Sequence, residues 1–249
     1  MSRSNPTETS SNPCTRWFEY AGGSDGGVVR YYDKEKKENV DVGDKFTFLL
    51  LDELSSVKGW HDASDSGIYS NEVRDTRQDV LVVKSFKGGE LASGLYANIR
   101  DRVGNFGGHF VMSCYIAYRN ENGGYSLGNI GFKGAALNAW VEFKKSCPTK
   151  NGRKAFYVDA IKIDGFDEGT KGRVTYRVPH FKLTPVSDEA NASAIALDEE
   201  LQAFLADYLR RGRVEQAEVA KSATPAEPAP ERQESRRSHE DFVDDDIPF

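Results

Sequence analysis

Apolar and polar residues alternate through most of the chain between residues 17 and 183, as they do in strands that bury one face. Glycine, asparagine and aspartate residues separate the alternating segments, which is typical of the turns between strands. Strands are predicted at residues 17–20, 28–33, 46–52, 68–74, 79–86, 109–119, 125–132, 154–165 and 173–183. The chain is therefore predicted to be mainly β.

Three segments have helical spacing instead. Two of them, at residues 93–103 and 135–145, interrupt the strands, and Leu137, Trp140 and Val141 share one face of the second. The third has acidic residues in its first turn and two arginines before a glycine at its end. Its apolar residues are Leu197, Leu201, Leu205, Tyr208 and Leu209. We expect this amphipathic helix to pack against its own domain rather than against a partner or a membrane.

The order of predicted elements from residue 109 to residue 183 is strand, tight turn at residues 121–124, strand, helix, strand, loop and strand. One more strand is needed before them, and residues 46–52 or 79–86 can supply it. The order then matches a five-stranded Greek-key barrel with its helix between the third and fourth strands, the oligonucleotide-binding (OB) fold. The apolar face of that helix would close the open end of the barrel. A β-rich domain of another topology with a covering helix is the open alternative.

Composition divides the chain into four parts. Residues 1–13 are polar, and residues 214–240 combine Glu, Ala, Pro, Ser, Gln and Arg without apolar periodicity, so both are predicted to be disordered. Residues 14–213 are predicted to form one OB-fold-like domain with extra strands and helices, and residues 241–249 an acidic tail. No stretch approaches eighteen apolar residues, and the first residues lack an apolar signal core. We therefore expect a cytoplasmic protein without a membrane partner.

The net charge of −6 is unevenly distributed. Residues 214–249 hold 4 basic and 10 acidic groups, whereas residues 1–213 hold 29 of each. Within the domain, residues 84–182 carry 16 basic and 8 acidic groups. Any basic face is therefore expected to come from this central stretch.

Binding of single-stranded nucleic acid needs cations for the phosphates and aromatic faces for the unpaired bases, and the central stretch supplies both. In residues 109–119, Phe110, Met112, Cys114 and Ile116 alternate as a core face, which turns Tyr115 and Arg119 outward. Arg173 and Arg177 share a face of the last strand, with Val174, Tyr176 and Val178 inward. The candidate DNA contacts are Arg100, Arg102, Tyr115, Arg119, Tyr125, Lys133, Arg153, Lys154, Tyr157, Arg173 and Arg177.

Other residues with possible chemistry give weaker indications. Trp60 lies in a segment, residues 54–67, that is predicted to be a long polar loop. Its side chain could stack on DNA, but pinning the loop to the domain is the favoured interpretation. Cys14, Cys114 and Cys147 lie far apart and the 4 histidines are scattered. No disulfide, metal site, catalytic group or cofactor is therefore expected.

Residues 241–249, DFVDDDIPF, join an acidic run to an apolar end. Such a segment cannot fold alone, because the aspartates repel one another and too few apolar side chains are present to offset ordering. The apolar side chains can fill a pocket on a partner while the aspartates meet Arg or Lys at its rim. The predicted partner-binding residues are Asp244, Asp245, Asp246, Ile247, Pro248 and Phe249. A solubilising acidic tail is the alternative.

The sequence DDDIPF closely resembles the tip of bacterial and phage single-stranded DNA-binding proteins (SSBs). In that family the tip recruits replication, recombination and repair proteins. The resemblance covers the tip and the linker before it, and the larger domain here is more similar to a phage-encoded member. It implies a non-catalytic protein that binds and protects single-stranded DNA without sequence specificity and recruits partner enzymes. The alternatives are a recombination or strand-annealing factor with the same tail, and a nuclease that carries the tip as a docking tag.

Overall fold

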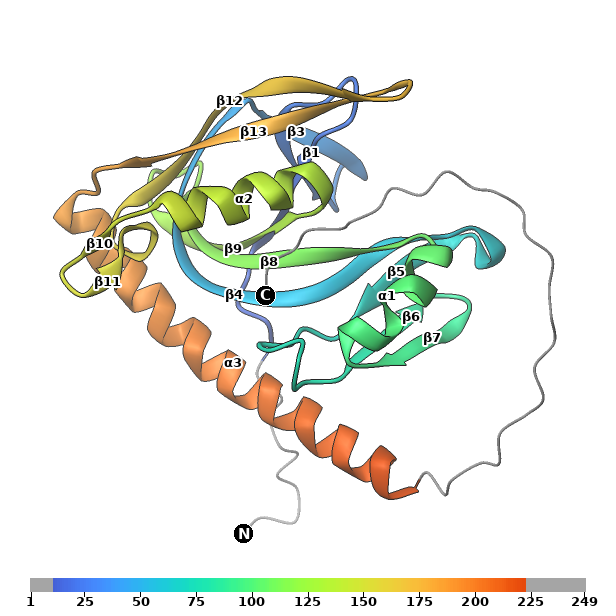
Figure 1. Ribbon diagram of the computed structural model, residues 1–249. Coiled ribbons are helices and arrows are strands. Elements are labelled where there is room, and N and C mark those ends of the chain that lie inside the picture. Colours follow the sequence, from blue (N-terminus) through green and yellow to red (C-terminus); the bar gives the residue numbers. More distant parts are fainter. Residues whose placement is uncertain (1–10, 223–249) are drawn as a thin grey trace, which may run out of the picture.

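The computed structural model describes residues 11–222, with side chains described through residue 212. Eleven strands of this part form one mixed sheet, and three α-helices pack against it (Figure 1). The prediction of a mainly β protein is confirmed. The bounds of the helices are α1 (Tyr96–Asn105), α2 (Gly134–Ser146) and α3 (Asp188–Ser222).

The strands of the large sheet follow one another closely along the chain. They are β1 (Arg16–Ala21), β2 (Val28–Asp33), β3 (Glu38–Gly43), β4 (Lys45–His61), β5 (Ser66–Ser70), β6 (Leu81–Ser85), β7 (Gly89–Gly94), β8 (Gly108–Arg119), β9 (Tyr125–Phe132), β12 (Ala160–Lys171) and β13 (Val174–Thr184). A separate small hairpin consists of β10 (Thr149–Lys150) and β11 (Arg153–Lys154). Two short 3-10 turns, η1 (Asp62–Ser64) and η2 (Ala155–Tyr157), precede β5 and β12.

The long strand β4 organises the sheet. The strand order is β3-β2-β1-β9-β8-β4-β5-β6-β7, and β1 runs parallel to β9. The first residues of β4 also pair with β12, which pairs with β13. Among the described strands β13 pairs with β12 alone, so the sheet does not close into the expected barrel.

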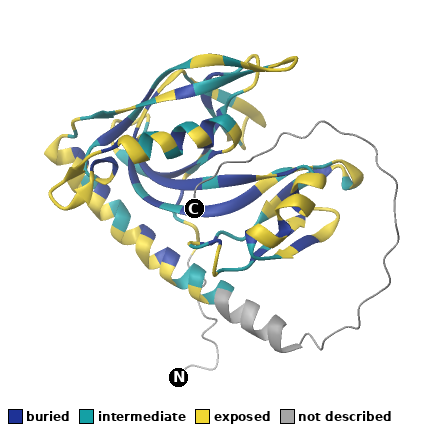
Figure 2. Ribbon diagram, viewed as in Figure 1, coloured by how far each residue is buried: buried dark blue, intermediate teal, exposed yellow. Residues whose placement is uncertain are grey.

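Both faces of β4 and β8 are covered, which accounts for their burial along most of their length (Figure 2). On one face α2 inserts Trp140, whose ring lies 5.1 Å from Phe132 and 5.1 Å from Phe181 between ring centroids. This agrees with the predicted inward face of that helix. On the other face α3 runs diagonally past the sheet (Figure 1) and packs Leu201 and Leu205 in one cluster with β-strand residues. The domain therefore has cores on both sides of the sheet.

Several predicted bounds are wrong for identifiable reasons. Residues 54–67 are not a loop, because β4 continues through His61 and pairs with β8 as far as Gly59. The expected strand at residues 154–165 is broken by η2, where Ala155 and Phe156 turn into the core. The sequence pattern also missed β3 and β7.

The C-terminal helix is longer than predicted. It begins at Asp188 and continues to Ser222, so it includes the first nine residues of the expected linker. The rest of the expected linker and tail, residues 223–249, and residues 1–10 lie outside the described residues.

Candidate nucleic-acid interface

Tyr115, the predicted stacking residue of β8, is almost completely buried. The alternation that predicted its face is correct, but α3 covers that face and leaves Tyr115 1% exposed. Its hydroxyl donates a hydrogen bond to the carboxylate of Glu72. Burial raises the pKa of Tyr115 far above its ordinary value, and the neighbouring Glu72 carboxylate raises it further. Tyr115 is a core residue, so the expectation that its ring is turned outward to solvent is wrong.

Arg177 is engaged within the protein. Its guanidinium donates to the carbonyl oxygen of Gly26 and to Glu168 at 3.2 Å, and it lies 4.7 Å from the centroid of the Phe166 ring. Its backbone N–H donates to the carbonyl oxygen of Gly22 at 2.8 Å. These contacts hold β13 against the loop after β1.

The expected inward position of Val174 on the same strand is wrong, because this side chain is 52% exposed where the β12–β13 hairpin projects from the body (Figure 1).

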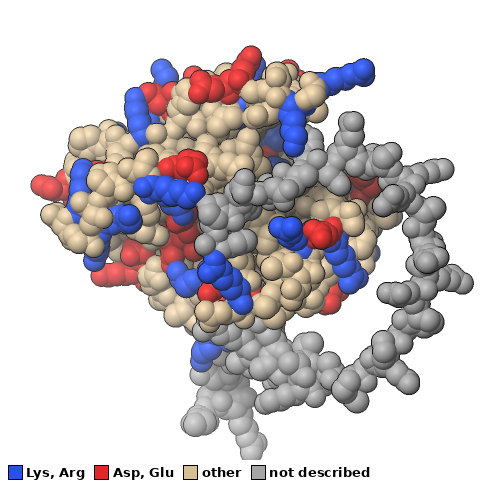
Figure 3. All heavy atoms as spheres, in the orientation of Figure 1, with Lys and Arg blue, Asp and Glu red and all other residues tan. Residues whose placement is uncertain are grey.

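The other predicted contacts are spread over the molecule. Arg100 and Arg102 are exposed on α1, before the start of β8, whereas Arg119 is exposed at its end and pairs across to Tyr125. A strand of 12 residues separates these groups, which corresponds to roughly 35 Å. Exposed positions elsewhere are Lys133 before α2, Arg153 and Lys154 in β11, Tyr157 in η2, and Arg173 in the turn before β13. On the face drawn in Figure 3, Lys and Arg form separate groups among Asp and Glu.

A compact group of aromatic and basic side chains lies elsewhere, on the outer face of β4, β5 and β6. We call Lys58, Trp60, Tyr69, Lys84 and Phe86 the aromatic–lysine patch. Strand register places Lys58, Tyr69 and Lys84 in one row across the three strands. Trp60 lies opposite Gly67 in the next row, and Phe86 donates its N–H to the carbonyl oxygen of Gly67 at 3.1 Å. Trp60 is 53% exposed, Tyr69 38% and Phe86 74%.

Local packing fixes the rings of the patch. A side chain at Gly67 would meet the Phe86 ring, since a Cβ there would lie 3.2 Å from it, so the absence of a side chain lets this ring lie over the strand. Phe86 then stacks on Tyr69 with 4.6 Å between ring centroids and 27° between planes. In the neighbouring η1 turn, the Ser64 hydroxyl shares hydrogen bonds with the His61 ring at 2.7 Å and with the Ser66 hydroxyl at 2.9 Å. The rings of Tyr69 and Phe86 are therefore held against each other.

The charges around the patch are favourable for an anion. Within the part of the chain that the structure describes, neither Lys58 nor Lys84 forms an ion pair, so both ammonium groups face solvent. Lys87, the next residue after the patch, donates to the backbone carbonyl oxygen of Asp65 at 3.0 Å. Two carboxylates lie near these lysines: Glu90 is opposite Lys84 on β7, and Glu72 lines the same pocket as Lys58. The expectation that Trp60 pins a loop is wrong, because this residue lies in β4 and its side chain is about half exposed.

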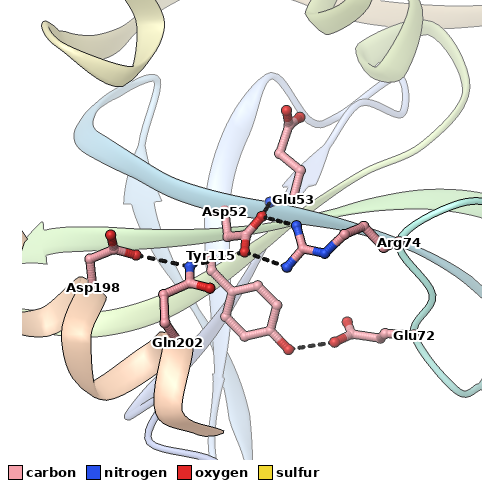
Figure 4. Close-up of polar contacts among 7 residues, drawn as sticks. All are labelled: Asp52, Glu53, Glu72, Arg74, Tyr115, Asp198 and Gln202. Carbon is pink, nitrogen blue, oxygen red and sulfur yellow. Dashed lines mark hydrogen bonds and ion pairs between the residues drawn. The ribbon is translucent and has the colours of Figure 1, made fainter. Parts of the chain in front are cut away.

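Acidic residues at the middle of β4 are occupied by donors from the neighbouring elements (Figure 4). The carboxylate of Asp52 accepts two hydrogen bonds from Arg74, both at 2.8 Å, and one from Gln202 of α3 at 3.0 Å. Burial alone would raise the pKa of Asp52, but these bonds and one from the Glu53 amide lower it below its ordinary value. Glu53 itself pairs with Lys144 of α2 at 2.8 Å. These carboxylates join both helices to the sheet.

Comparisons of this chain with protein-family models, curated proteins and solved structures find no match. Among residues 11–222, no helix is both long and apolar enough to span a membrane. The same residues include no group of three or more His, Cys, Asp or Glu side chains placed to hold a metal ion.

Proposed function

We propose that this protein binds single-stranded DNA without sequence specificity and recruits partner enzymes through Asp244, Asp245, Asp246, Ile247, Pro248 and Phe249, which lie outside the described residues. The observation that carries the DNA-binding proposal is the aromatic–lysine patch. Exposed rings on a β-surface offer stacking faces to any base, each worth about 1–3 kcal/mol, and such stacking is tolerant of sequence. The interleaved ammonium groups can neutralise phosphates of the same strand.

The spacing of the patch suits a single strand. Adjacent β-strands lie about 4.8 Å apart, so the rings of Trp60 on β4 and Phe86 beyond β6 are separated by roughly two such intervals. Successive bases of a strand that crosses β4, β5 and β6 can therefore stack on different rings. Lys58 and Lys84 lie on either side of Tyr69 in the adjacent row, where the phosphates of that strand would pass.

We further propose that β4, β8, β9, α2, β12 and β13 form an open variant of the OB fold. In support of this, β4 pairs with both β8 and β12, and α2 lies between β9 and β12 in sequence. A closed barrel would also need β9 to pair with β13. Here β1 pairs with β9 instead, and β13 contacts the β1–β2 loop through the hydrogen bond from the Arg177 backbone N–H to Gly22. In this arrangement the elements β5, β6, β7 and α1 form the connection between the first and second strands. That connection is one of the two loops through which OB folds contact oligonucleotides, and the β12–β13 turn with Arg173 is the other.

The test is a titration of the full chain with oligo-dT and with a matching duplex at two salt concentrations. We expect a preference for the single strand and an affinity that falls with salt at a slope near −0.7 per phosphate contacted, on logarithmic axes. Trp60→Ala and Phe86→Ala should each weaken binding by about 1–3 kcal/mol, and Lys84→Ala should reduce the salt slope by about 0.7. Tyr32→Ala, which removes a 56% exposed ring on β2 outside the patch, is the matched control.

Other outcomes of the same titration would contradict the proposal. Equal affinity for the duplex, a flat salt response, or patch variants that bind as tightly as the control would exclude stacking on this surface. Assembly of rings or filaments on DNA would favour the strand-annealing alternative. Cleavage of single strands that requires magnesium would favour the nuclease alternative.

A further inference from the structure

A pocket of about 240 Å³ adjoins the aromatic–lysine patch. Lys58 and Tyr69 of the patch also line the pocket, so the two features are continuous. The pocket lies on the same face of β4 as α3, because Leu54 packs under that helix and Ser56, Lys58 and Trp60 follow it at every second position. The pocket therefore lies between the part of β4 that α3 covers and the exposed patch.

The walls of the pocket are aromatic. Trp17 of β1, 44% exposed, and Phe204 and Tyr208 of α3 line it together with Tyr69. Flat walls of this kind favour a flat ring as ligand, because a ring can contact them over its whole face. The volume lies below the roughly 300 Å³ at which pockets for drug-sized ligands begin. The space therefore suits one ring system better than a complete nucleotide.

Two polar side chains that line the pocket can take further hydrogen bonds. Ser56 is only 1% exposed, and its hydroxyl oxygen has no hydrogen-bond partner among the described residues. Buried polar groups are almost always hydrogen-bonded, so an unpartnered one indicates a missing ligand or water. The Glu72 carboxylate accepts from the hydroxyls of Ser113 and Tyr115 and, as an acceptor with about four lone-pair sites, can accept more.

These groups match one class of base. A carboxylate acceptor pairs with the exocyclic amino group of cytosine, adenine or guanine, whereas thymine presents a carbonyl oxygen at the corresponding position. The Ser56 hydroxyl can donate to, or accept from, a second atom of the ring edge. Lys58 at the rim can meet the phosphate of the same nucleotide.

We propose that this pocket receives one base of the bound strand, turned out from the stack on the aromatic–lysine patch, and prefers a base with an exocyclic amino group. A base of a single strand has no pairing partner to lose, so turning it outward costs less than in a duplex. This inference rests on the proposed function. It adds a preference at one nucleotide to binding that is otherwise independent of sequence.

The experiment uses the full chain and two short oligonucleotides, all thymine and the same length with one central cytosine. The cytosine strand should bind about twofold to tenfold more tightly, the effect of one net hydrogen bond. Glu72→Gln should abolish this difference, because the side-chain amide can donate to the thymine carbonyl oxygen as well as accept from the cytosine amino group. Ser56→Ala, which removes a group that can donate or accept, should keep the difference. Trp60→Ala should weaken both strands equally and keep the difference. A third oligonucleotide carries 2-aminopurine, whose fluorescence is quenched on stacking, at the central position. Its fluorescence should decrease on binding to the wild type and decrease less on binding to Trp17→Leu.

The outcomes separate this proposal from the one on which it rests. If the patch variants lower affinity but the two oligonucleotides bind alike, the pocket takes no base and the proposed function stands. The same holds if the cytosine preference survives Glu72→Gln and Trp17→Leu leaves the quenching unchanged. If neither oligonucleotide binds, the proposed function fails and the base pocket fails with it.

Discussion

At the scale of single residues, Glu72 links the face of β8 to α3. Its carboxylate accepts from the hydroxyls of Ser113 and Tyr115, and its backbone N–H donates to the Tyr208 hydroxyl of α3 at 2.8 Å. Ser113 in turn accepts from the side-chain amide of Asn129 at 2.7 Å. The hydrogen bonds to the Glu72 carboxylate offset the desolvation penalty of burying its charge. Loss of either donor would leave part of that penalty uncompensated and lower the stability of the fold.

The first prediction follows from this arrangement. Tyr115→Phe keeps the ring but removes one donor to Glu72, so it should lower the free energy of unfolding by about 1–3 kcal/mol. Urea denaturation measures this change, with Tyr32→Phe on the exposed face of β2 as the control. Affinity for oligo-dT should be unchanged, since the ring lies beneath α3. A loss of DNA affinity without a loss of stability would show that Tyr115 is accessible in solution.

At the scale of elements, alternation in the sequence predicted strands well where one face meets the core. The bounds of β2 and β9 agree with the predicted residues 28–33 and 125–132, and Leu137 and Trp140 of α2 are buried as predicted. The same reasoning could have found two of the five residues of the patch. Leu81 and Val83 mark the core face of β6, so Lys84 and Phe86 must point to the other face.

Other elements depend on contacts that no local pattern records. The second half of β4 contains Ser55, Ser56 and Gly59, which are typical of loops, yet pairing with β8 and β5 keeps this segment extended. Tyr115 was placed on the correct face, but its burial follows from the docking of α3, whose residues lie more than seventy positions later. Alternation identifies the two faces of a strand. It does not show which later helix covers the second face.

The second prediction concerns the docking of α3. The pKa of Asp52 is lowered in the folded state by Arg74 and by Gln202 of α3, so the folded protein holds this carboxylate ionised. A lowered pKa contributes stability above the unfolded value of about 4, and that contribution is lost as the pH falls through the folded value. The free energy of unfolding should therefore decrease as the pH is lowered below about 4. This decrease should be smaller in Asp52→Asn.

Urea denaturation between pH 3 and pH 6 measures this effect. Asp41→Asn, at an exposed position of β3, is the control for removal of one carboxylate. If Asp52→Asn and wild type lose stability in parallel as the pH falls, the bonds from Arg74 and Gln202 do not control the ionisation of Asp52.

At the scale of the whole molecule, β4 and β8 extend through both ends of the domain and connect them. At one end they carry α2 and the β12–β13 hairpin, and at the other β5, β6, β7 and α1 (Figure 1). The aromatic–lysine patch lies at the second end. The helix α3 spans the same face and leads from the domain toward residues 223–249, which include the acidic segment. The chain therefore combines a surface with exposed rings and lysines, which we propose binds DNA, with an acidic segment.

The third prediction concerns that acidic segment. Residues 214–249 carry a net charge of −6 and residues 84–182 a net charge of +8, so the aspartates can compete with DNA for cations of the same molecule, at the high local concentration that a tether provides. Deletion of residues 241–249 should leave the folding of the domain intact and modestly raise affinity for short oligonucleotides at low salt. It should also abolish the capture of replication enzymes from extract.

Phe249→Ala should abolish capture without raising DNA affinity, because it removes the apolar anchor and keeps every aspartate. If extracts yield the same proteins with and without these nine residues, the segment is a solubilising tail and recruits nothing.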